Sequence, residues 1–251
     1  MSRPRLARVA AAALLAAPSA ASAQAPAGFT PDQRAAIVEV LREALRSDPS
    51  ILREAIAALQ ADNARREAEA SRSVVRAQAE ALFRDPADPS LGPPRARTTL
   101  VEFTDYRCPY CRAMRPVLAE LLRSDGDLRL VVKPLPVLGP ASVTAARAAL
   151  AAQLQGRFAP FHEALMALRG GMEEEAILQL ATETGLDAAR LRRDMASAEV
   201  TRRLSASLRL AETLGIQGTP AFVVGDTLLP GAVPIERLRE AVAAARAAAS
   251  R

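Results

Sequence analysis

The chain has 251 residues, of which 50% are hydrophobic, and it carries a formal net charge of +5. This hydrophobic fraction is high enough for a packed core and argues against wholesale disorder. Two Cys and one His exclude a zinc site built from four Cys, or from two Cys and two His.

The first 23 residues have the pattern of a secretory signal peptide. Arg3, Arg5 and Arg8 precede an apolar stretch at residues 9–17, and residues 21–23 (ASA) fit a small-residue cleavage site. The alternative is a membrane anchor, but the apolar stretch is too short for one. Cleavage would lower the net charge to +2, so nucleic-acid binding is not predicted. It would place the protein in a bacterial periplasm, where disulfides persist.

Two helices are predicted after the signal. Thr30-Pro31-Asp32-Gln33 has the form of a capping box, and Asp48-Pro49 starts a second helix. Apolar residues then recur at helical spacing (Ile37, Val38, Leu41, Ala44 and Leu45, then Leu52, Ile56 and Leu59). Such short amphipathic helices cannot bury their apolar stripes alone. We favour self-association over packing against the rest of the chain.

The remaining chain predicts an α/β domain. Residues 85–97 are rich in Asp-Pro and Gly-Pro turns and form a linker, in which Ser90-Leu91 is a candidate edge strand. The order of elements predicts a mostly parallel sheet with one antiparallel edge and helices on both faces. Strands are expected at 98–103, 128–132, 221–224 and 227–229, and helices at 111–123, over 140–214 with breaks at Gly156, Gly170-Gly171 and Gly185, and at 234–249.

Both cysteines lie in one C-x-x-C motif, where a strand leads into a helix. As a structural disulfide, so small a loop would stabilise the fold by only about 2 kcal/mol. A metal site would need two more ligands, and the only His, His162, is far away in the sequence and more typical of a packing or surface residue. A redox role is therefore favoured.

The motif assigns different roles to its two thiols. Cys108 is predicted at the start of the helix, where the helix dipole and free backbone N–H groups favour the thiolate. The thiolate is the attacking species in disulfide exchange. Pro109 begins the helix and Tyr110 fills the next position. Cys111, one turn in, is expected to be more buried and to resolve the mixed disulfide.

Two other features support this interpretation. Glu102 interrupts an apolar strand, where burial would raise its pKa and let it accept the Cys111 proton; the alternative is a solvated strand edge. Lys133 ends the neighbouring strand, either near Glu102 or on the surface. Thr219-Pro220 precedes a strand and fits a cis-proline turn, with a trans turn as the alternative. A cis-proline turn would hold the Thr219 backbone beside Cys108 for pairing with substrate.

Aromatic residues gather around the motif in the sequence. Phe103, Tyr106 and Tyr110 are candidates for an apolar patch that accepts unfolded substrates. Core packing is the alternative for Phe103.

Residues 101–112 (VEFTDYRCPYCR) with 218–225 (GTPAFVVG) resemble the thioredoxin superfamily and, more narrowly, the DsbA-like periplasmic thiol–disulfide oxidoreductases. The resemblance implies a thioredoxin fold with a helical domain inserted at about residues 139–198. It also implies that Cys108 attacks, Cys111 resolves, Thr219-Pro220 is the cis-proline loop and Glu102 is the buried acid.

The leader at residues 29–60 is similar to the N-terminal segment of the ScsC (suppressor of copper sensitivity) group, which forms oligomers, trimers in some members. Tyr110 stands where the oxidase DsbA has a His, and this departure argues against strong oxidase activity.

These observations predict a thioredoxin fold with a helical insert, preceded by an N-terminal helical segment. The expected divisions are a signal peptide (1–23), a helical oligomerisation segment with linker (24–86) and the DsbA-like domain (87–251). The predicted function is a protein-disulfide isomerase or reductase acting on unfolded or misoxidised exported proteins, served by a membrane redox partner. No cofactor or resident metal is expected. The alternatives are a dithiol oxidase and a copper-binding thiol protein in metal tolerance.

Overall fold

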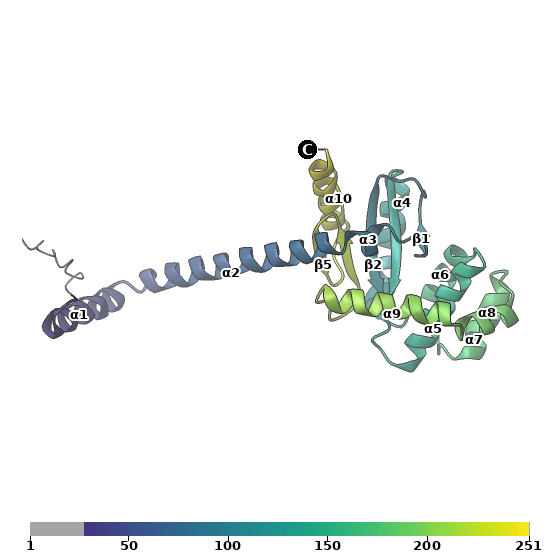
Figure 1. Ribbon diagram of the computed structural model, residues 1–251, viewed down its shortest axis with the longest axis horizontal. Helices are drawn as coiled ribbons and strands as arrows, with labels where there is room; N and C mark the ends of the chain where they lie inside the picture. The colour runs from purple at the N-terminus through teal and green to yellow at the C-terminus, as the bar shows by residue number, and fades with distance from the viewer. Residues whose placement is uncertain (1–27, 251) are drawn as a thin grey trace, which may run out of the picture. The chain divides into compact units, whose positions relative to one another are not determined.

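The computed structural model describes residues 28–250 (Figure 1). It contains two compact units, with the boundary between Gln60 and Ala61. The predicted signal peptide, residues 1–23, lies outside the described residues.

The first unit contains helix α1 (Pro31–Ser47) and the beginning of α2 (Ser50–Ala77). Thr30 caps α1 as predicted: its hydroxyl accepts from Gln33 N at 3.3 Å, and the Gln33 side chain accepts from Thr30 N at 2.9 Å. Asp48 starts α2 by accepting from Ser50 N at 2.9 Å. No residue of α1 is buried, so its apolar stripe is left uncovered.

The second unit is built around a mixed sheet. Its strands lie in the order β1-β3-β2-β4-β5. Only β2 and β3 pair in parallel, whereas the β1–β3, β2–β4 and β4–β5 pairings are antiparallel. The prediction of a mostly parallel sheet with one antiparallel edge is therefore wrong. The bounds are β1 (Ser90–Leu91), β2 (Thr98–Thr104), β3 (Leu128–Pro134), β4 (Ala221–Val224) and β5 (Thr227–Pro230).

The direction of β4 determines where the second predicted motif lies. Because β4 runs antiparallel to β2, its first residue, Ala221, pairs with Phe103 near the end of β2. The Thr219-Pro220 turn before β4 and the C-x-x-C motif after β2 therefore meet at the same end of the strands. If β4 were parallel to β2, the turn and the motif would lie at opposite ends of the strands.

The predicted helical stretch after β3 forms five helices. It breaks near the three predicted glycine positions and once more before α9, where Ser197 accepts a hydrogen bond from Val200 N. Helices α5–α8 gather to one side of the sheet (Figure 1). The helices of this unit are α3 (Ala79–Phe83), α4 (Pro109–Ser124), α5 (Pro140–Leu154), α6 (Phe158–Ala167), α7 (Glu174–Glu183), α8 (Ala188–Met195), α9 (Ala198–Thr213) and α10 (Ile235–Ala249), with the end of α2.

Hydrophobic cores cover both faces of the sheet. We call them the α4 face, which includes Leu100, Met114, Phe161, Phe222 and Leu238, and the α9 face, which includes Val75, Leu82, Phe103, Leu210 and Val223. Since the end of α2 and α3 supply Val75 and Leu82 to the α9 face, the second compact unit begins well before residue 87, where the sequence placed the domain boundary.

Candidate active site

The C-x-x-C motif lies where β2 leads into α4. Cys108 is the N-cap of α4, and Pro109 lies in its first turn. Cys108 Sγ donates to the carbonyl oxygen of Thr219 at 3.3 Å, and the Thr219–Pro220 peptide bond is cis, as predicted. The backbone before β4 therefore contacts the first sulfur directly.

The two thiols differ in exposure in the predicted sense. Both are free, with 5% of Cys108 and 1% of Cys111 exposed. Burial raises the pKa of the Cys111 thiol far above its usual range, and the negative charge of Glu102 contributes to the shift. Cys111 must therefore lose its proton to a nearby base before it can act as a nucleophile at neutral pH.

Asp105, which the sequence analysis did not single out, fixes the loop beside the cysteines. Its buried carboxylate accepts from Arg107 N at 2.8 Å, from Val137 N at 2.9 Å and from Leu138 N at 3.1 Å. The Arg107 side chain donates to the Leu138 carbonyl at 2.7 Å. An Asp that precedes a helix by a few residues is a signal for such backbone bonds, but the distant loop was not apparent from the sequence.

The aromatic residues near the motif do not form one surface patch. Phe103 and Tyr106 are fully buried, whereas 67% of Tyr110 is exposed. Val137 and Leu138, the residues that Asp105 holds in place, are also exposed, at 48% and 44%. Phe103 therefore packs in the core, as the alternative for it expected, and the predicted patch is wrong for Tyr106, which is buried as well.

Glu102 lies on the α4 face and is buried, with 1% exposed. Its Oε1 has no hydrogen-bond partner among the described residues. Burial raises the pKa of Glu102 to about 7, and the negative charge of Glu163 adds to the shift. A solvated strand edge, the alternative considered above, is excluded.

Lys133 lies on the other face of the sheet. It pairs in register with Phe103, whereas Glu102 pairs with Val132, and side chains alternate between faces along a strand. Its Nζ donates to the Ala81 carbonyl at 2.7 Å and forms an ion pair with Asp88. Neither predicted position, near Glu102 or on the surface, is correct.

A small cavity lies behind Cys111. It has a volume of about 30 Å³, and its polar lining comes from Glu102, Cys111, Arg115, His162 and Glu163. Glu163 accepts from Arg115 Nε at 2.5 Å. The cavity therefore joins the buried thiol and the buried acid to two side chains of α6, the helix after α5.

His162 is a buried, uncharged member of this cavity. Its Nδ1 shares a hydrogen bond with the Tyr106 hydroxyl at 3.0 Å, and burial lowers its pKa to about 4, helped by the positive charge of Arg115. The packing role predicted for His162 agrees with this contact. Over residues 28–250, no group of three or more His, Cys, Asp or Glu side chains is arranged to hold a metal ion.

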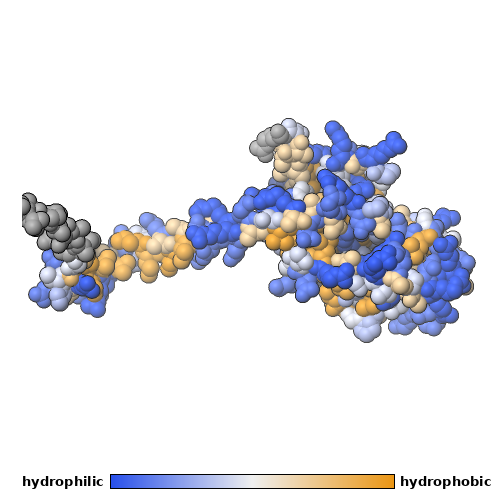
Figure 2. All heavy atoms as spheres, viewed as in Figure 1, coloured by the Kyte–Doolittle hydropathy of each residue, from blue (hydrophilic) through white to orange (hydrophobic). Residues whose placement is uncertain are grey.

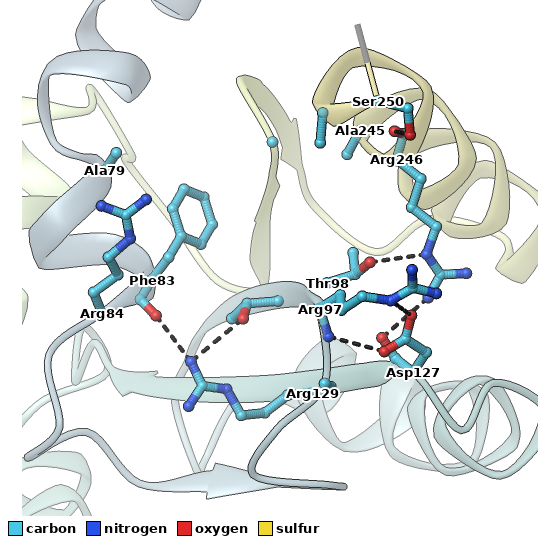
Figure 3. A pocket seen from close by; sticks show the side chains of 14 residues that line it. Ala79, Phe83, Arg84, Arg97, Thr98, Asp127, Arg129, Ala245, Arg246 and Ser250 are labelled. Atoms are coloured by element: carbon cyan, nitrogen blue, oxygen red, sulfur yellow. Dashed lines mark hydrogen bonds and ion pairs between the residues drawn. The ribbon is translucent and has the colours of Figure 1, made fainter.

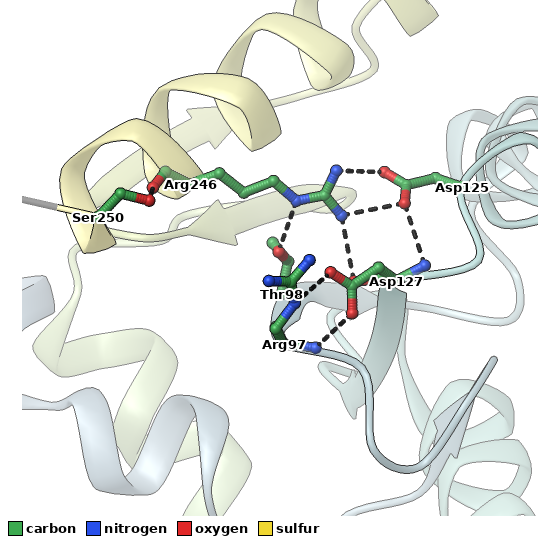
Figure 4. Close-up of polar contacts among 6 residues, drawn as sticks. All are labelled: Arg97, Thr98, Asp125, Asp127, Arg246 and Ser250. Atoms are coloured by element: carbon green, nitrogen blue, oxygen red, sulfur yellow. Dashed lines mark hydrogen bonds and ion pairs between the residues drawn. The ribbon is translucent and has the colours of Figure 1, made fainter.

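A much larger hollow, of about 650 Å³, lies at the opposite end of the strands (Figure 3). Arg84 and Arg129 line one side of it. On the other side, Arg246 donates to Thr98 and forms an ion pair with Asp125 at 2.9 Å, as Figure 4 shows. Thr98 is the first of the seven residues of β2, and the cysteines follow the last one. The length of the strand, roughly 20 Å, therefore lies between this hollow and the cysteines. Its side chains join α10 and α3 to the sheet far from the thiols.

Comparisons with known proteins match both parts of the chain. Residues 99–243 match the family model of the DsbA-like thioredoxin domain, and residues 33–66 match the N-terminal domain of copper resistance protein ScsC. A thioredoxin-like oxidoreductase from Silicibacter pomeroyi is 47% identical, with a TM-score of 0.65, over 66% of this chain and 96% of that one. ScsC from Proteus mirabilis is 32% identical, with a TM-score of 0.65, over 87% of this chain and 99% of that one.

The curated relatives are longer proteins. Na⁺/H⁺ antiporter NhaA 1 of Salinispora arenicola is 34% identical over 166 residues, which are 64% of this chain and 26% of the antiporter. This chain thus spans about a quarter of the length of the curated relatives it matches, and the antiporter name describes those proteins.

In the part of the chain that the structure describes, no helix has both the length and the apolar character needed to cross a membrane.

Proposed function

The chain belongs to the family of proteins with a DsbA-like thioredoxin domain, and from this premise we propose that it is a periplasmic protein-disulfide isomerase or reductase. Its substrates are unfolded or misoxidised exported proteins. The observation that carries the proposal is the placement of Cys108 Sγ at the N-cap of α4, 3.3 Å from the Thr219 carbonyl oxygen, with Cys111 buried one turn behind it.

The chemistry assigned to this geometry has two exchange steps. The Cys108 thiolate attacks one sulfur of a substrate disulfide, and the other substrate sulfur leaves as a thiolate. The Cys111 thiolate then attacks Cys108 Sγ, which releases the second substrate thiol and leaves a Cys108–Cys111 disulfide. The substrate gains two electrons and the pair loses two. In isomerisation a substrate thiol attacks instead, and no net oxidation occurs.

Substrate recognition is assigned to two features beside Cys108. The Thr219 backbone lies against the sulfur and offers a place for an extended substrate segment to pair. Exposed Tyr110, Val137 and Leu138 offer apolar surface near it. Such surface favours chains whose hydrophobic residues are not yet buried, and this choice of substrate suits an enzyme of exported proteins.

The isomerase direction rests on self-association of the first unit. Its large apolar side chains are exposed (41% of Ile37, 55% of Leu41, 54% of Leu52, 46% of Ile56 and 61% of Leu59). Figure 2 shows the resulting hydrophobic surface along the first half of α2. Apolar stripes of this kind are buried when helices from several copies pack together. An assembly places several Cys108 thiols around one substrate, an arrangement that favours repeated exchange.

A trapping experiment tests the assigned roles. Without its resolving thiol, Cys111→Ala should accumulate long-lived mixed disulfides through Cys108, which mass spectrometry of captured substrates identifies. Cys108→Ala is the matched control and should capture nothing. Equal capture by the two variants, or none by either, would remove the proposal.

The assembly is tested on the full chain. Leu59→Asp should lower the mass measured by light scattering and reduce the reactivation of scrambled ribonuclease. Gln60→Asp, which places the same charge at the next exposed position, should change neither. If Leu59→Asp keeps both mass and isomerase activity, and wild type oxidises reduced ribonuclease faster than it reactivates the scrambled form, the protein is a dithiol oxidase.

A second candidate is Cu(I) binding by the reduced cysteine pair, since thiolates are the soft ligands that Cu(I) prefers. It is favoured by the match of residues 33–66 to a domain named for copper resistance. Anaerobic Cu(I) titration should then show one site in wild type and none in Cys108→Ser. Retention of the site in Cys108→Ser would exclude the thiolates as its ligands.

A further inference from the structure

Glu102, the buried acid on the α4 face, must pass the proton that it accepts from Cys111 on to solvent. Each time Cys111 attacks Cys108, the Cys111 thiol loses one proton. The acceptor, Glu102, is only 1% exposed, so it cannot pass this proton directly to bulk water. Lys133, the other buried ionisable residue of the central strands, cannot relay it, because Lys133 lies on the α9 face and pairs with Asp88.

Apart from the buried hydroxyl of Thr104, two residues along the same strand, the polar surroundings of Glu102 lie in one direction. In the sheet its neighbours in register are Val132 and Phe222, both apolar and buried. Toward α4 and α6 it borders the 30 Å³ cavity, whose ionisable lining is Cys111, Arg115, His162 and Glu163. That volume has room for a water molecule with polar partners on several sides. Of these groups only Arg115 and Glu163 reach solvent, with 38% and 42% of their side chains exposed.

We propose that Glu163, held by Arg115, is the outer carboxylate of a proton route that runs from Cys111 through Glu102 and the cavity to solvent between α4 and α6. The inference rests on the function proposed above. Glu163 touches no reacting sulfur, so it acts through Glu102 and is a positioning residue for the proton.

Proton and electron balance define the step. The Cys111 S–H proton moves to the Glu102 carboxylate, and the sulfur electron pair forms the bond to Cys108 Sγ. The bond between Cys108 and the substrate sulfur breaks, and the substrate sulfur leaves with that pair. Glu102 then passes its proton across the cavity to Glu163, which exchanges it with bulk water. In the oxidative direction, where Cys111 leaves as a thiolate, one proton moves inward along the same route to Cys111.

The other groups facing the cavity do not compete for this role. His162 is uncharged near neutral pH and its Nδ1 is engaged by Tyr106 at 3.0 Å. Tyr106 itself does not line the cavity; it is fully buried, and burial raises the pKa of its hydroxyl well above the usual value. Arg115 carries a permanent charge and donates to Glu163 at 2.5 Å. This ion pair holds the Glu163 carboxylate beside the cavity.

The test follows release of substrate thiol from a mixed disulfide between Cys108 and glutathione, from pH 5 to 9, in the full chain. The variant is Glu163→Gln. Its control is Glu120→Gln, on the same helix as Cys111, where Glu120 forms an exposed ion pair with Arg239 at 3.0 Å. Loss of the relay should slow release by about tenfold, a modest general acid–base effect. Added imidazole buffer should restore the Glu163→Gln rate in proportion to its concentration and leave wild type unchanged.

The pH profile separates the relay from a merely structural role. Because the Glu163 charge raises the pKa of Glu102, Glu163→Gln should also move the midpoint of the profile to lower pH. Glu163→Asp should recover part of the rate, and this second variant provides the test if Glu163→Gln fails to fold. The inference would be overturned if wild type released thiol and Glu163→Gln did so at the Glu120→Gln rate at every pH. The same result for Glu163→Asp would overturn it where Glu163→Gln does not fold. Absence of release from wild type itself would instead overturn the proposed function.

Discussion

The central strands bury one ionisable side chain on each face of the sheet, and the two side chains differ in how completely they are hydrogen-bonded. On the α9 face, Lys133 donates to the Ala81 carbonyl and pairs with Asp88. On the α4 face, Glu102 has an oxygen without a hydrogen-bond partner among the described residues, and it borders a cavity. A buried charge whose partners are complete holds a fold together, whereas one that lacks them is suited to gaining and losing a proton. The comparison separates an ion pair with complete partners from the buried acid to which we assign a proton-transfer role.

Removing the charge on the α9 face should have the largest effect on stability. Lys133→Met leaves Asp88, of whose side chain 18% is exposed, without its cation, and breaking one side of a buried pair costs about 3–5 kcal/mol. Urea unfolding at pH 7 measures the loss. The double variant Lys133→Met/Asp88→Leu should recover most of it, since an apolar pair of similar size avoids the uncompensated charge. A loss below about 1 kcal/mol for Lys133→Met is typical of an exposed ion pair. Such a result would contradict the conclusion that the Lys133–Asp88 pair stabilises the fold.

Removing the acid on the α4 face should have the opposite sign. The pKa of Glu102 is raised from 4.5 to about 7 in the folded protein, so its contribution to stability is fully present below pH 4.5 and is lost as pH rises through 7. At pH 8, Glu102→Gln should therefore be more stable than wild type by up to about 3 kcal/mol.

Denaturant unfolding of Glu102→Gln and wild type at pH 4.5 and pH 8 measures this difference. Other groups that titrate alike in both proteins contribute equally to the two free energies of unfolding, so their contributions cancel. The same variant should release glutathione from Cys108 more slowly. A stability difference that does not grow between the two pH values would show that Glu102 is not a strained, buried acid.

The smallest expected effect concerns an uncharged pair on the α4 face. Tyr106→Phe removes the hydroxyl that bonds His162 at 3.0 Å, which should cost about 1 kcal/mol in the free energy of unfolding. Thermal unfolding of Tyr106→Phe beside Tyr110→Phe, whose exposed hydroxyl has no such buried partner, isolates the bond. Equal melting temperatures for the two variants would show that the His162 contact contributes nothing.

Local sequence signals were sufficient for much of this molecule. The capping box at Thr30, the strand before Cys108 and the cis-proline turn at Pro220 each depend on a few consecutive residues, and the structure contains all three. The greater burial of Cys111 also followed from its position one turn into a helix.

Long-range geometry was not available from the sequence. The direction of β4 depends on the path of the chain through the five helices before it, and the face that Lys133 occupies depends on the register between β2 and β3. Asp105 meets Val137 and Leu138, and Arg115 meets Glu163, only after distant segments have packed. Chemistry carried by neighbouring residues was therefore predictable, and chemistry shared between elements was not.

The slight exposure of Cys108, only 5%, bears on the function proposed above. With so little of the sulfur open beside the Thr219 carbonyl, we expect a flexible, extended segment to reach it more readily than the surface of a folded protein. Under the proposed function, disulfides already enclosed in folded proteins would then be exchanged slowly, and selectivity would come from the conformation of the substrate.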